Sequence, residues 1–155
     1  MTTNFSSDVD VGRRQEWMRL LACSEPAELQ MLWDGLRNKP EFQQLRPSES
    51  GLLMTRGRMG GTGDAFNLGE ITVTRCSVRT EDGHIWHAYV TGRDRAHAER
   101  AAMCDAMLQD PGRAVSVERI ILMPLRMSEQ KRRSKRGAQV AATKVDFFTM
   151  VRGED

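Results

Sequence analysis

The sequence predicts an α+β fold with an N-terminal helical hairpin, a mainly antiparallel sheet built around a central β-hairpin, and further helices packed on that sheet. Apolar residues recur at helical spacing before residue 40, whereas residues 70–91 are rich in β-branched and aromatic residues. An Asp82-Gly83 pair separates two strand-like runs, which is a strong hairpin signal. Strands joined by hairpins, with helices before and after them, are typical of the α+β class.

Length and composition indicate one globular domain. The chain has 155 residues, and we place a single domain at residues 13–155 after a flexible N-terminus of residues 1–12. Hydrophobic residues make up 39% and charged residues 28%, and the net charge of +2 does not indicate a nucleic-acid or membrane binder. Three cysteines without Cys-x-x-Cys spacing, and the lack of a signal peptide or an apolar run of about 20 residues, predict a cytoplasmic protein.

Two amphipathic helices open the domain. The first is predicted at residues 13–23, behind a pair of arginines. Ser24 is expected to cap the second helix, with Pro26 in its first turn, where proline is tolerated. Lys39-Pro40 should end it, because the residue before a proline disfavours helical geometry. The short connection predicts that the two helices form a hairpin.

Three strands should follow, at residues 51–57, 70–79 and 84–91. A two-residue Asp82-Gly83 turn fixes a register between the last two. In that register the facing pairs are Val78 with His87, Cys76 with Tyr89, and Arg79 with Trp86.

In this register, each face of the hairpin carries both polar and apolar residues. Neither is plainly solvent-facing, so we expect this chain to cover one face and another chain to cover the other. Arg79 would stack on Trp86 by a cation–π contact.

The second half is predicted to be mostly helical. Asp94 should cap an alanine-rich helix that runs to residue 109, and small side chains would let this helix lie close to the sheet. Residues 115–122 resemble another strand, and Ser128 should cap a basic helix that ends near residue 142. For residues 144–152 we favour a strand, although a continued helix also fits the pattern.

A glycine-rich segment between residues 55 and 70 is the most informative motif. Glycines let several backbone N–H groups point inward together, and arginine matches phosphate bidentately. The spacing fits neither a Walker A loop nor a dinucleotide fingerprint. The loop therefore either docks against a partner chain or contacts phosphate, and Glu70 either positions a ligand or faces a partner. The ligand- or partner-binding candidates are Arg56, Gly57, Arg58, Gly60, Gly61, Gly63, Asn67 and Glu70.

No catalytic set and no metal site can be assembled from spacing. His84 and His87 lie three residues apart on a predicted strand, so their side chains point to opposite faces. His97 belongs to the next helix, and we interpret all three histidines as structural. Cys76 and Cys104 are expected to be small buried hydrophobes.

A basic run between residues 126 and 136 has two open interpretations. It is either the solvated face of a helix or a contact surface for an acidic partner. No aromatic residues are interleaved with the charges, which argues against nucleic acid. The residues of this candidate surface are Lys131, Arg132, Arg133, Lys135 and Arg136.

Four long blocks carry a resemblance to a known family. They are RQEWMRLLA at residues 14–22, LRPSESGLLMTRGRMGGTGDAFNLGEITVTRC at 45–76, HAYVTGRDRAHAERAAMCDAM at 87–107 and VDFFTMVRGED at 145–155. Through these blocks the chain resembles the PhnG family, the small subunits of the bacterial carbon–phosphorus lyase core complex. The resemblance covers almost the whole chain from residue 14 onward.

The resemblance implies a subunit that is not active alone. Its partners would be PhnI, PhnH and PhnJ, two copies of each, with PhnL required for activity and PhnI as the catalytic chain. The complex would displace adenine from ATP by an alkylphosphonate such as methylphosphonate, giving α-D-ribose 1-alkylphosphonate 5-triphosphate. The resemblance carries over no catalytic residue and no cofactor to this chain, and it implies neither nucleic acid nor a membrane as partner.

Overall fold

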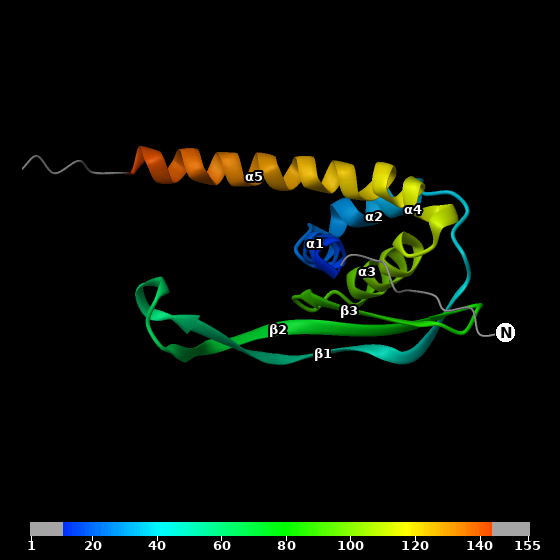
Figure 1. Ribbon diagram of the computed structural model, residues 1–155, viewed down its shortest axis with the longest axis horizontal. Helices are drawn as coiled ribbons and strands as arrows, with labels where there is room; N and C mark the ends of the chain where they lie inside the picture. Colours follow the sequence, from blue (N-terminus) through cyan, green and yellow to red (C-terminus); the bar gives the residue numbers. More distant parts are fainter. Residues whose placement is uncertain (1–10, 144–155) are drawn as a thin grey trace, which may run out of the picture.

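The computed structural model describes residues 11–143 and confirms the α+β class (Figure 1). A three-stranded antiparallel sheet in the order β1-β2-β3 lies beneath a layer of helices. Along the chain the elements are α1 (Val11–Ala22), α2 (Pro26–Gly35), β1 (Phe42–Arg58), η1 (Met59–Gly61), β2 (Ala65–Thr80), β3 (Ile85–Thr91), α3 (Arg95–Leu108), α4 (Pro111–Val117), the π-helical turn η2 (Glu118–Leu122) and α5 (Met123–Ala142).

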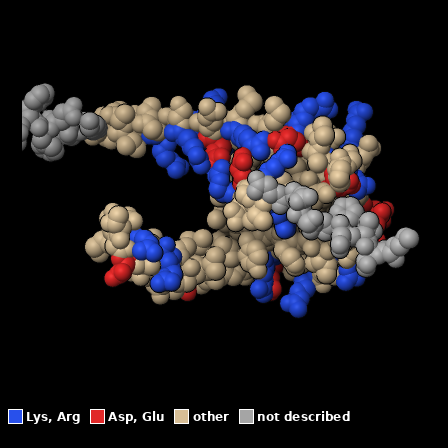
Figure 2. Space-filling view, in the orientation of Figure 1, with Lys and Arg blue, Asp and Glu red and all other residues tan. Residues whose placement is uncertain are grey.

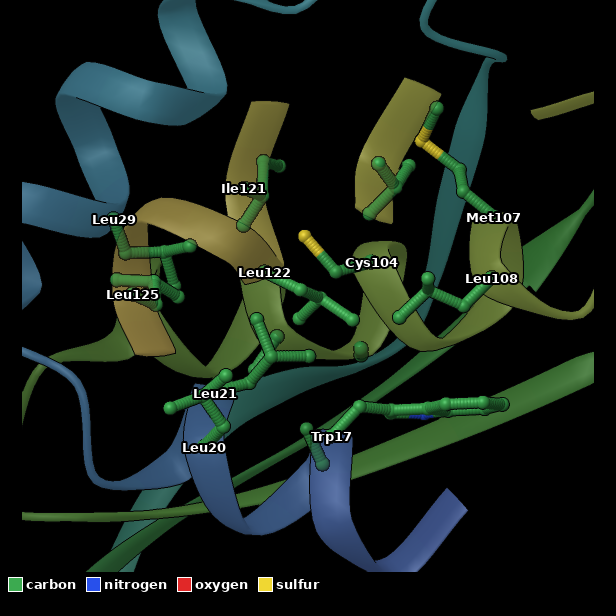
Figure 3. Packing of buried hydrophobic residues seen from close by; sticks show 14 of the residues in the cluster. Trp17, Leu20, Leu21, Leu29, Cys104, Met107, Leu108, Ile121, Leu122 and Leu125 are labelled. Atoms are coloured by element: carbon green, nitrogen blue, oxygen red, sulfur yellow. The ribbon is translucent and has the colours of Figure 1, made fainter. Parts of the chain in front are cut away.

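The hydrophobic core lies between the helices and one face of the sheet (Figure 3). Leu21 of α1 and Leu29 of α2 are fully buried against the segment that carries Ile121 and Leu122. From below, β2 contributes Val78, which is also fully buried. Because helices α1 to α5 and η2 all contribute to this one cluster, they form a single packed body with the sheet.

Helix α3 confirms the predicted capped, alanine-rich helix. The Asp94 side chain accepts a hydrogen bond of 2.9 Å from the backbone N–H of His97, which satisfies a donor at the start of the helix. Ala98, Ala101 and Ala102 are buried, so α3 packs against the sheet through methyl groups.

The predicted hairpin register is wrong by one residue. Val78 pairs with Trp86, and Arg79 pairs with Ile85. The connection has three residues rather than two, because the N–H of Thr80 donates to the carbonyl of His84 at 3.0 Å. Gly83 takes a φ of 86°, the left-handed geometry that closes such a three-residue loop. The other two predicted pairs fail in the same way, since Cys76 faces Ala88, Tyr89 faces Arg75 and His87 faces Ser77.

The corrected register gives the sheet one buried face and one open face. Val78, Ala88 and Val90 point into the core, whereas Ile85 and Tyr89 are 45% and 58% exposed on the opposite side. The predicted stacking of Arg79 on Trp86 is therefore wrong, because paired neighbours Arg79 and Ile85 lie on the open face. Instead the guanidinium of Arg14 lies over the Trp86 ring, 5.8 Å from its centre.

Strand β1 is much longer than the predicted strand at residues 51–57. It begins at Phe42, and its pairing with β2 has register irregularities on each side of Arg46 and a third between Thr55 and Arg56. A proline at position 47 and the two irregularities beside Arg46 interrupt the strand pattern in the first half of β1, so the sequence does not predict that half.

Residues 115–122, predicted as a strand, are helical. Val117, Ile121 and Leu125 are fully buried at intervals of four residues, whereas Val115 is exposed. The predicted cap at Ser128 is also wrong, because α5 already begins at Met123 with Pro124 in its first turn. The Ser128 hydroxyl instead donates to the Glu28 carboxylate of α2.

The connection between α1 and α2 differs from its prediction in two details. The Ser24 hydroxyl donates to the carbonyl of Leu21 at 2.8 Å and does not cap α2, whose N-cap is Glu25. Helix α2 ends at Gly35, before the predicted stop at Lys39-Pro40. The strand favoured for residues 144–152 lies outside the described residues.

A buried carboxylate ties α1 to α3. Asp105 is completely buried, and it accepts hydrogen bonds from Arg14 Nη2 at 2.7 Å, Trp17 Nε1 at 2.9 Å and Gln109 Nε2 at 3.1 Å. These donors compensate for burying a charge, which would otherwise cost several kcal/mol.

Candidate partner-binding surface

Strands β1 and β2 continue well past the end of β3. Strand β3 pairs with β2 only between Val73 and Arg79, whereas the β1–β2 ladder runs on to the pair Arg58 and Ala65. The two-stranded extension, residues 51–58 and 65–72 with the turn between them, is called the arm here. Figure 1 shows it projecting beyond α1–α4, on the same side of the body as the far end of α5. A two-stranded ribbon is marginal in water by itself, so the arm is expected to need a further packing partner.

The arm exposes an unusual number of large apolar side chains. Leu52 and Leu68 are 66% and 67% exposed, and both strands and the tip contribute further members. Many exposed apolar side chains on one projecting element are typical of a protein–protein interface. The exposed apolar residues of the arm are Leu52, Leu53, Met54, Met59, Phe66, Leu68 and Ile71.

The glycine-rich loop forms the tip of the arm. Gly60 and Gly61 have φ angles of 61° and 82°, and the N–H of Gly63 donates to the carbonyl of Met59 at 3.0 Å. A β-carbon at Gly63 would lie 2.8 Å from that carbonyl oxygen, so the turn requires glycine there. Arg58 Nη1 donates to the Gly63 carbonyl at 3.0 Å. The glycines therefore have a conformational reason to be present.

All of the candidate binding residues in this segment lie on the arm. Gly57 and Arg58 end β1, while Asn67 pairs with Arg56 across the ribbon. Glu70 lies within β2, opposite Met54, rather than at the start of a strand. Docking of the loop against a partner and contact with phosphate both stay predictions.

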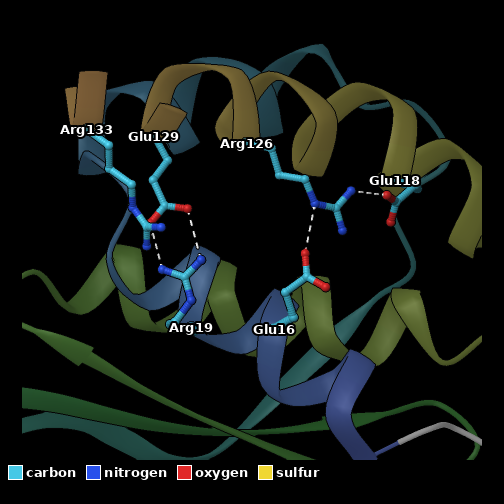
Figure 4. A network of polar contacts seen from close by, with 6 residues as sticks. All are labelled: Glu16, Arg19, Glu118, Arg126, Glu129 and Arg133. Atoms are coloured by element: carbon cyan, nitrogen blue, oxygen red, sulfur yellow. Dashed lines mark hydrogen bonds and ion pairs between the residues drawn. The ribbon is translucent and has the colours of Figure 1, made fainter. Parts of the chain in front are cut away.

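Helix α5 is held on the body by its first turns through a polar network (Figure 4). Glu129 accepts two hydrogen bonds from Arg19 of α1, at 2.6 and 2.9 Å, so the two residues form a bidentate pair. The network consists of Glu16, Arg19, Glu118, Arg126, Glu129 and Arg133.

The basic run is therefore not uniformly solvated. Arg133 pairs with Glu129 at 2.8 Å, and Arg132 approaches Glu28 at 3.4 Å. Within residues 11–143, Lys131, Lys135 and Arg136 have no acidic partner. Those three cations are the part of the predicted contact surface that intrachain pairing leaves available.

Lowering the pH should weaken the attachment of α5. The hydrogen bond from Arg19, with help from Arg133, lowers the pKa of Glu129 to about 2 from an ordinary value of 4.5. A depressed folded-state pKa means that the stabilisation is present above about pH 4.5 and is lost as the pH falls towards 2. Because Arg19 is 45% exposed, we expect the pair to contribute only about 1 kcal/mol.

Urea unfolding of the wild type and of Glu129→Gln at pH 7 and at pH 2.5 measures this contribution. The two proteins should differ by about 1 kcal/mol at pH 7 and by much less at pH 2.5. A difference that does not change with pH would contradict the assignment.

The reactive side-chain types do not converge in the described part of the chain. His84 and His87 lie on or beside β3, whereas His97 is buried in α3 with Nε2 2.7 Å from the carbonyl oxygen of Leu21. Residues 11–143 contain no group of three potential metal ligands. Cys76 and Cys104 are buried, as predicted. This burial raises the pKa of both thiols, which makes them poor nucleophiles.

None of the helices among residues 11–143 combines the length and the hydrophobicity that crossing a bilayer requires.

Sequence reasoning missed the apolar residues of the arm as a site. Their signal is the run Leu52-Leu53-Met54, in which neighbouring apolar residues occupy both faces of one strand, followed by Phe66 and Leu68 on the other strand. A half-buried strand alternates instead, so such a run outside the core indicates contact on both faces.

The chain is similar to known proteins over almost its whole length. Residues 12–153 match the model of a family described as phosphonate metabolism protein PhnG. The chain is also 46% identical over 151 residues to the alpha-D-ribose 1-methylphosphonate 5-triphosphate synthase subunit PhnG of Rhizobium meliloti (strain 1021). That alignment covers 97% of this chain and 96% of the relative. On the extent of both matches, this chain belongs to the PhnG family of phosphonate metabolism proteins.

Proposed function

We propose that this chain is a non-catalytic subunit of an alpha-D-ribose 1-methylphosphonate 5-triphosphate synthase. In that role it supports the transfer of an alkylphosphonate to the ribose C1 of ATP, with release of adenine. The observation that carries the proposal is the arm, because its apolar side chains are exposed in the single chain and contact with another subunit would bury them. The relative with 46% identity bears the name of a subunit of this synthase.

The partners we propose are PhnI, PhnH and PhnJ, with PhnL required for activity. In this proposal PhnI would supply the chemistry, as the resemblance to PhnG subunits implies. ATP and the alkylphosphonate would bind at the level of the complex. This chain would hold no cofactor of its own and would stabilise the catalytic subunit by covering its surface.

Co-expression of the tagged chain with the other synthase subunits tests this function. We expect a stable complex that releases adenine from ATP in the presence of methylphosphonate and PhnL. The same subunits without this chain should lose that activity, and this chain by itself should release no adenine. The proposal would be overturned if this chain stayed monomeric in the presence of the other subunits, or if it released adenine from ATP without them.

The alternative is an autonomous phosphate-ligand or nucleotide-binding module that uses the tip of the arm. One observation favours it, because Arg56 and Arg58 lie beside the exposed glycine turn and Arg56 has no ion-pair partner within residues 11–143. Calorimetric titration of the isolated chain with ATP separates the two functions. Affinity that Arg56→Ala abolishes would support the alternative, and Arg56 is the better probe because Arg58 also holds the turn.

A further inference from the structure

We propose that the space between α5 and the arm receives an acidic, partly apolar segment of a partner subunit. The proposal rests on the proposed function, since it presupposes assembly into the synthase. Figure 1 shows α5 and the arm projecting from the body in the same direction, and Figure 2 shows a hollow between them. The two projections therefore form the two sides of one open site.

The distal half of α5 makes few contacts with its own chain. Leu125 anchors its first turns in the core, and Arg132 and Arg133 make its last ion pairs in the described structure. Every residue from Ser134 to Ala142 is exposed. An isolated helix is marginally stable in water, so two exposed turns that leave the body are best explained by a partner that covers them.

One face of α5 looks into the hollow. Leu125 and Glu129 mark the side that faces the body, because Leu125 is buried and Glu129 bonds to Arg19. Spacings of three and four residues carry that side onward to Arg132, Arg136 and Val140. Figure 2 shows Lys and Arg side chains on the underside of α5, at the border of the hollow. This wall of the site is therefore cationic and ends in an apolar side chain.

The arm supplies the opposite wall with similar chemistry. Strand alternation puts Leu52, Met54, Arg56 and Arg58 on one face of β1, so apolar and cationic residues share that face. Glu70 pairs with Met54 and shares this face, so the two arginines of the arm are matched in number by its two carboxylates, Asp64 and Glu70. The surplus positive charge of the site therefore comes from Arg136 of α5, which has no acidic partner within residues 11–143. Carboxylates on an incoming segment would match the guanidinium groups bidentately, while its apolar side chains would pack on the arm.

Other occupants fit the site less well. A second copy that placed its α5 in this hollow would bring a basic helix against Arg136, which like-charge repulsion disfavours. Nucleic acid is disfavoured because no aromatic platform accompanies the arginines of α5. An acidic segment of a partner subunit satisfies both the charge and the apolar surface.

Photo-cross-linking in the assembled complex tests the occupant directly. Val140 is replaced by p-benzoylphenylalanine, and Ala138, which lies about 200° away around the helix, serves as the matched control. We expect Val140 to cross-link to a partner-subunit peptide rich in Asp and Glu, and Ala138 not to reach that peptide. Cross-links only to a second copy or to residues 144–155 of the same chain would overturn the proposal, as would a basic partner peptide.

Charge reversal supplies the second measurement. Arg136→Glu removes no intrachain ion pair of the described structure, so the fold should be retained. We expect it to raise the dissociation constant of the complex by at least about tenfold at low salt, and to flatten the dependence on salt. Arg119→Glu, at an exposed position of η2 outside the site, should change the constant less than about twofold.

The outcomes also separate this proposal from the proposed function. If the complex forms normally with Arg136→Glu, the acidic occupant is wrong although the subunit role stands. If the wild-type chain forms no complex at all, the subunit role itself fails.

Discussion

Replacing Asp105 with alanine is expected to lower the free energy of unfolding by about 3 kcal/mol. The substitution removes the acceptor of a 2.9 Å hydrogen bond from Trp17 Nε1 and the carboxylate that pairs with Arg14 at 2.7 Å. The indole N–H would then be buried without an acceptor, and one polar link between α1 and α3 would be lost. Arg14 is 43% exposed and regains water, which keeps the expected loss towards the lower end for a broken buried pair.

Urea unfolding of the full chain, followed by far-ultraviolet circular dichroism, measures this loss. A chain of this size should also melt roughly 6–12 °C lower for a change of about 3 kcal/mol. The matched control is Asp34→Ala, because Asp34 makes a comparable side-chain hydrogen bond, to Gln30, on an exposed helix surface. The control should stay within about 0.5 kcal/mol of the wild type. Equal losses in both variants would show that burial of Asp105 is not what makes it important.

The helices were predictable where periodicity and a cap agreed. Residues 94–109 combine an Asp cap with small residues on the buried side, and α3 has that form. The strand prediction for residues 115–122 was wrong because it followed the local preference of their β-branched residues. Burial of Val117, Ile121 and Leu125 at four-residue spacing requires a helix instead. Tertiary packing therefore overrode the local β propensity of this segment.

The sheet was predictable in its hairpin but not in its register or extent. Asp-Gly favours a two-residue turn, yet Gly83 in left-handed geometry closes a three-residue loop and shifts every pair by one. The long pairing joins residues 51–58 to residues 65–72, the segments on the two sides of the glycine-rich turn. Nothing in the local pattern shows that β3 ends before this pairing does.

The candidate residues between positions 56 and 70 lie together on the arm, and their role in partner docking or phosphate contact stays a prediction. Arg56, Gly61 and Glu70 do lie on one projecting element, as expected for a contact surface. The sequence motif indicated phosphate binding as one of two interpretations, because phosphate-binding loops are built from glycines and arginines. The structure explains Gly63 by a steric demand of the turn instead, and the surrounding apolar residues become prominent only when their exposure is known.

The largest effect on assembly is expected from the arm. Replacing both Leu52 and Leu68 with serine should weaken binding to the other synthase subunits by roughly a hundredfold or more. Burying one leucine contributes about 1.5–3 kcal/mol, so two that become fully covered at an interface account for that change. Both side chains are about two-thirds exposed in the single chain, at 66% and 67%. Their loss should therefore leave the melting temperature of the isolated chain nearly unchanged.

A pair of equally exposed apolar residues on the body provides the control for the arm. Met31 on α2 and Val115 on α4 are 66% and 73% exposed, but they belong to no such cluster. Replacing both with serine should leave the dissociation constant within about twofold, because scattered surface apolar residues are normal in proteins. Affinity is measured by surface plasmon resonance with the co-purified partner subunits immobilised. If the arm variant binds like the control variant, the apolar arm is not the interface, and burial elsewhere must hold the subunit in its complex.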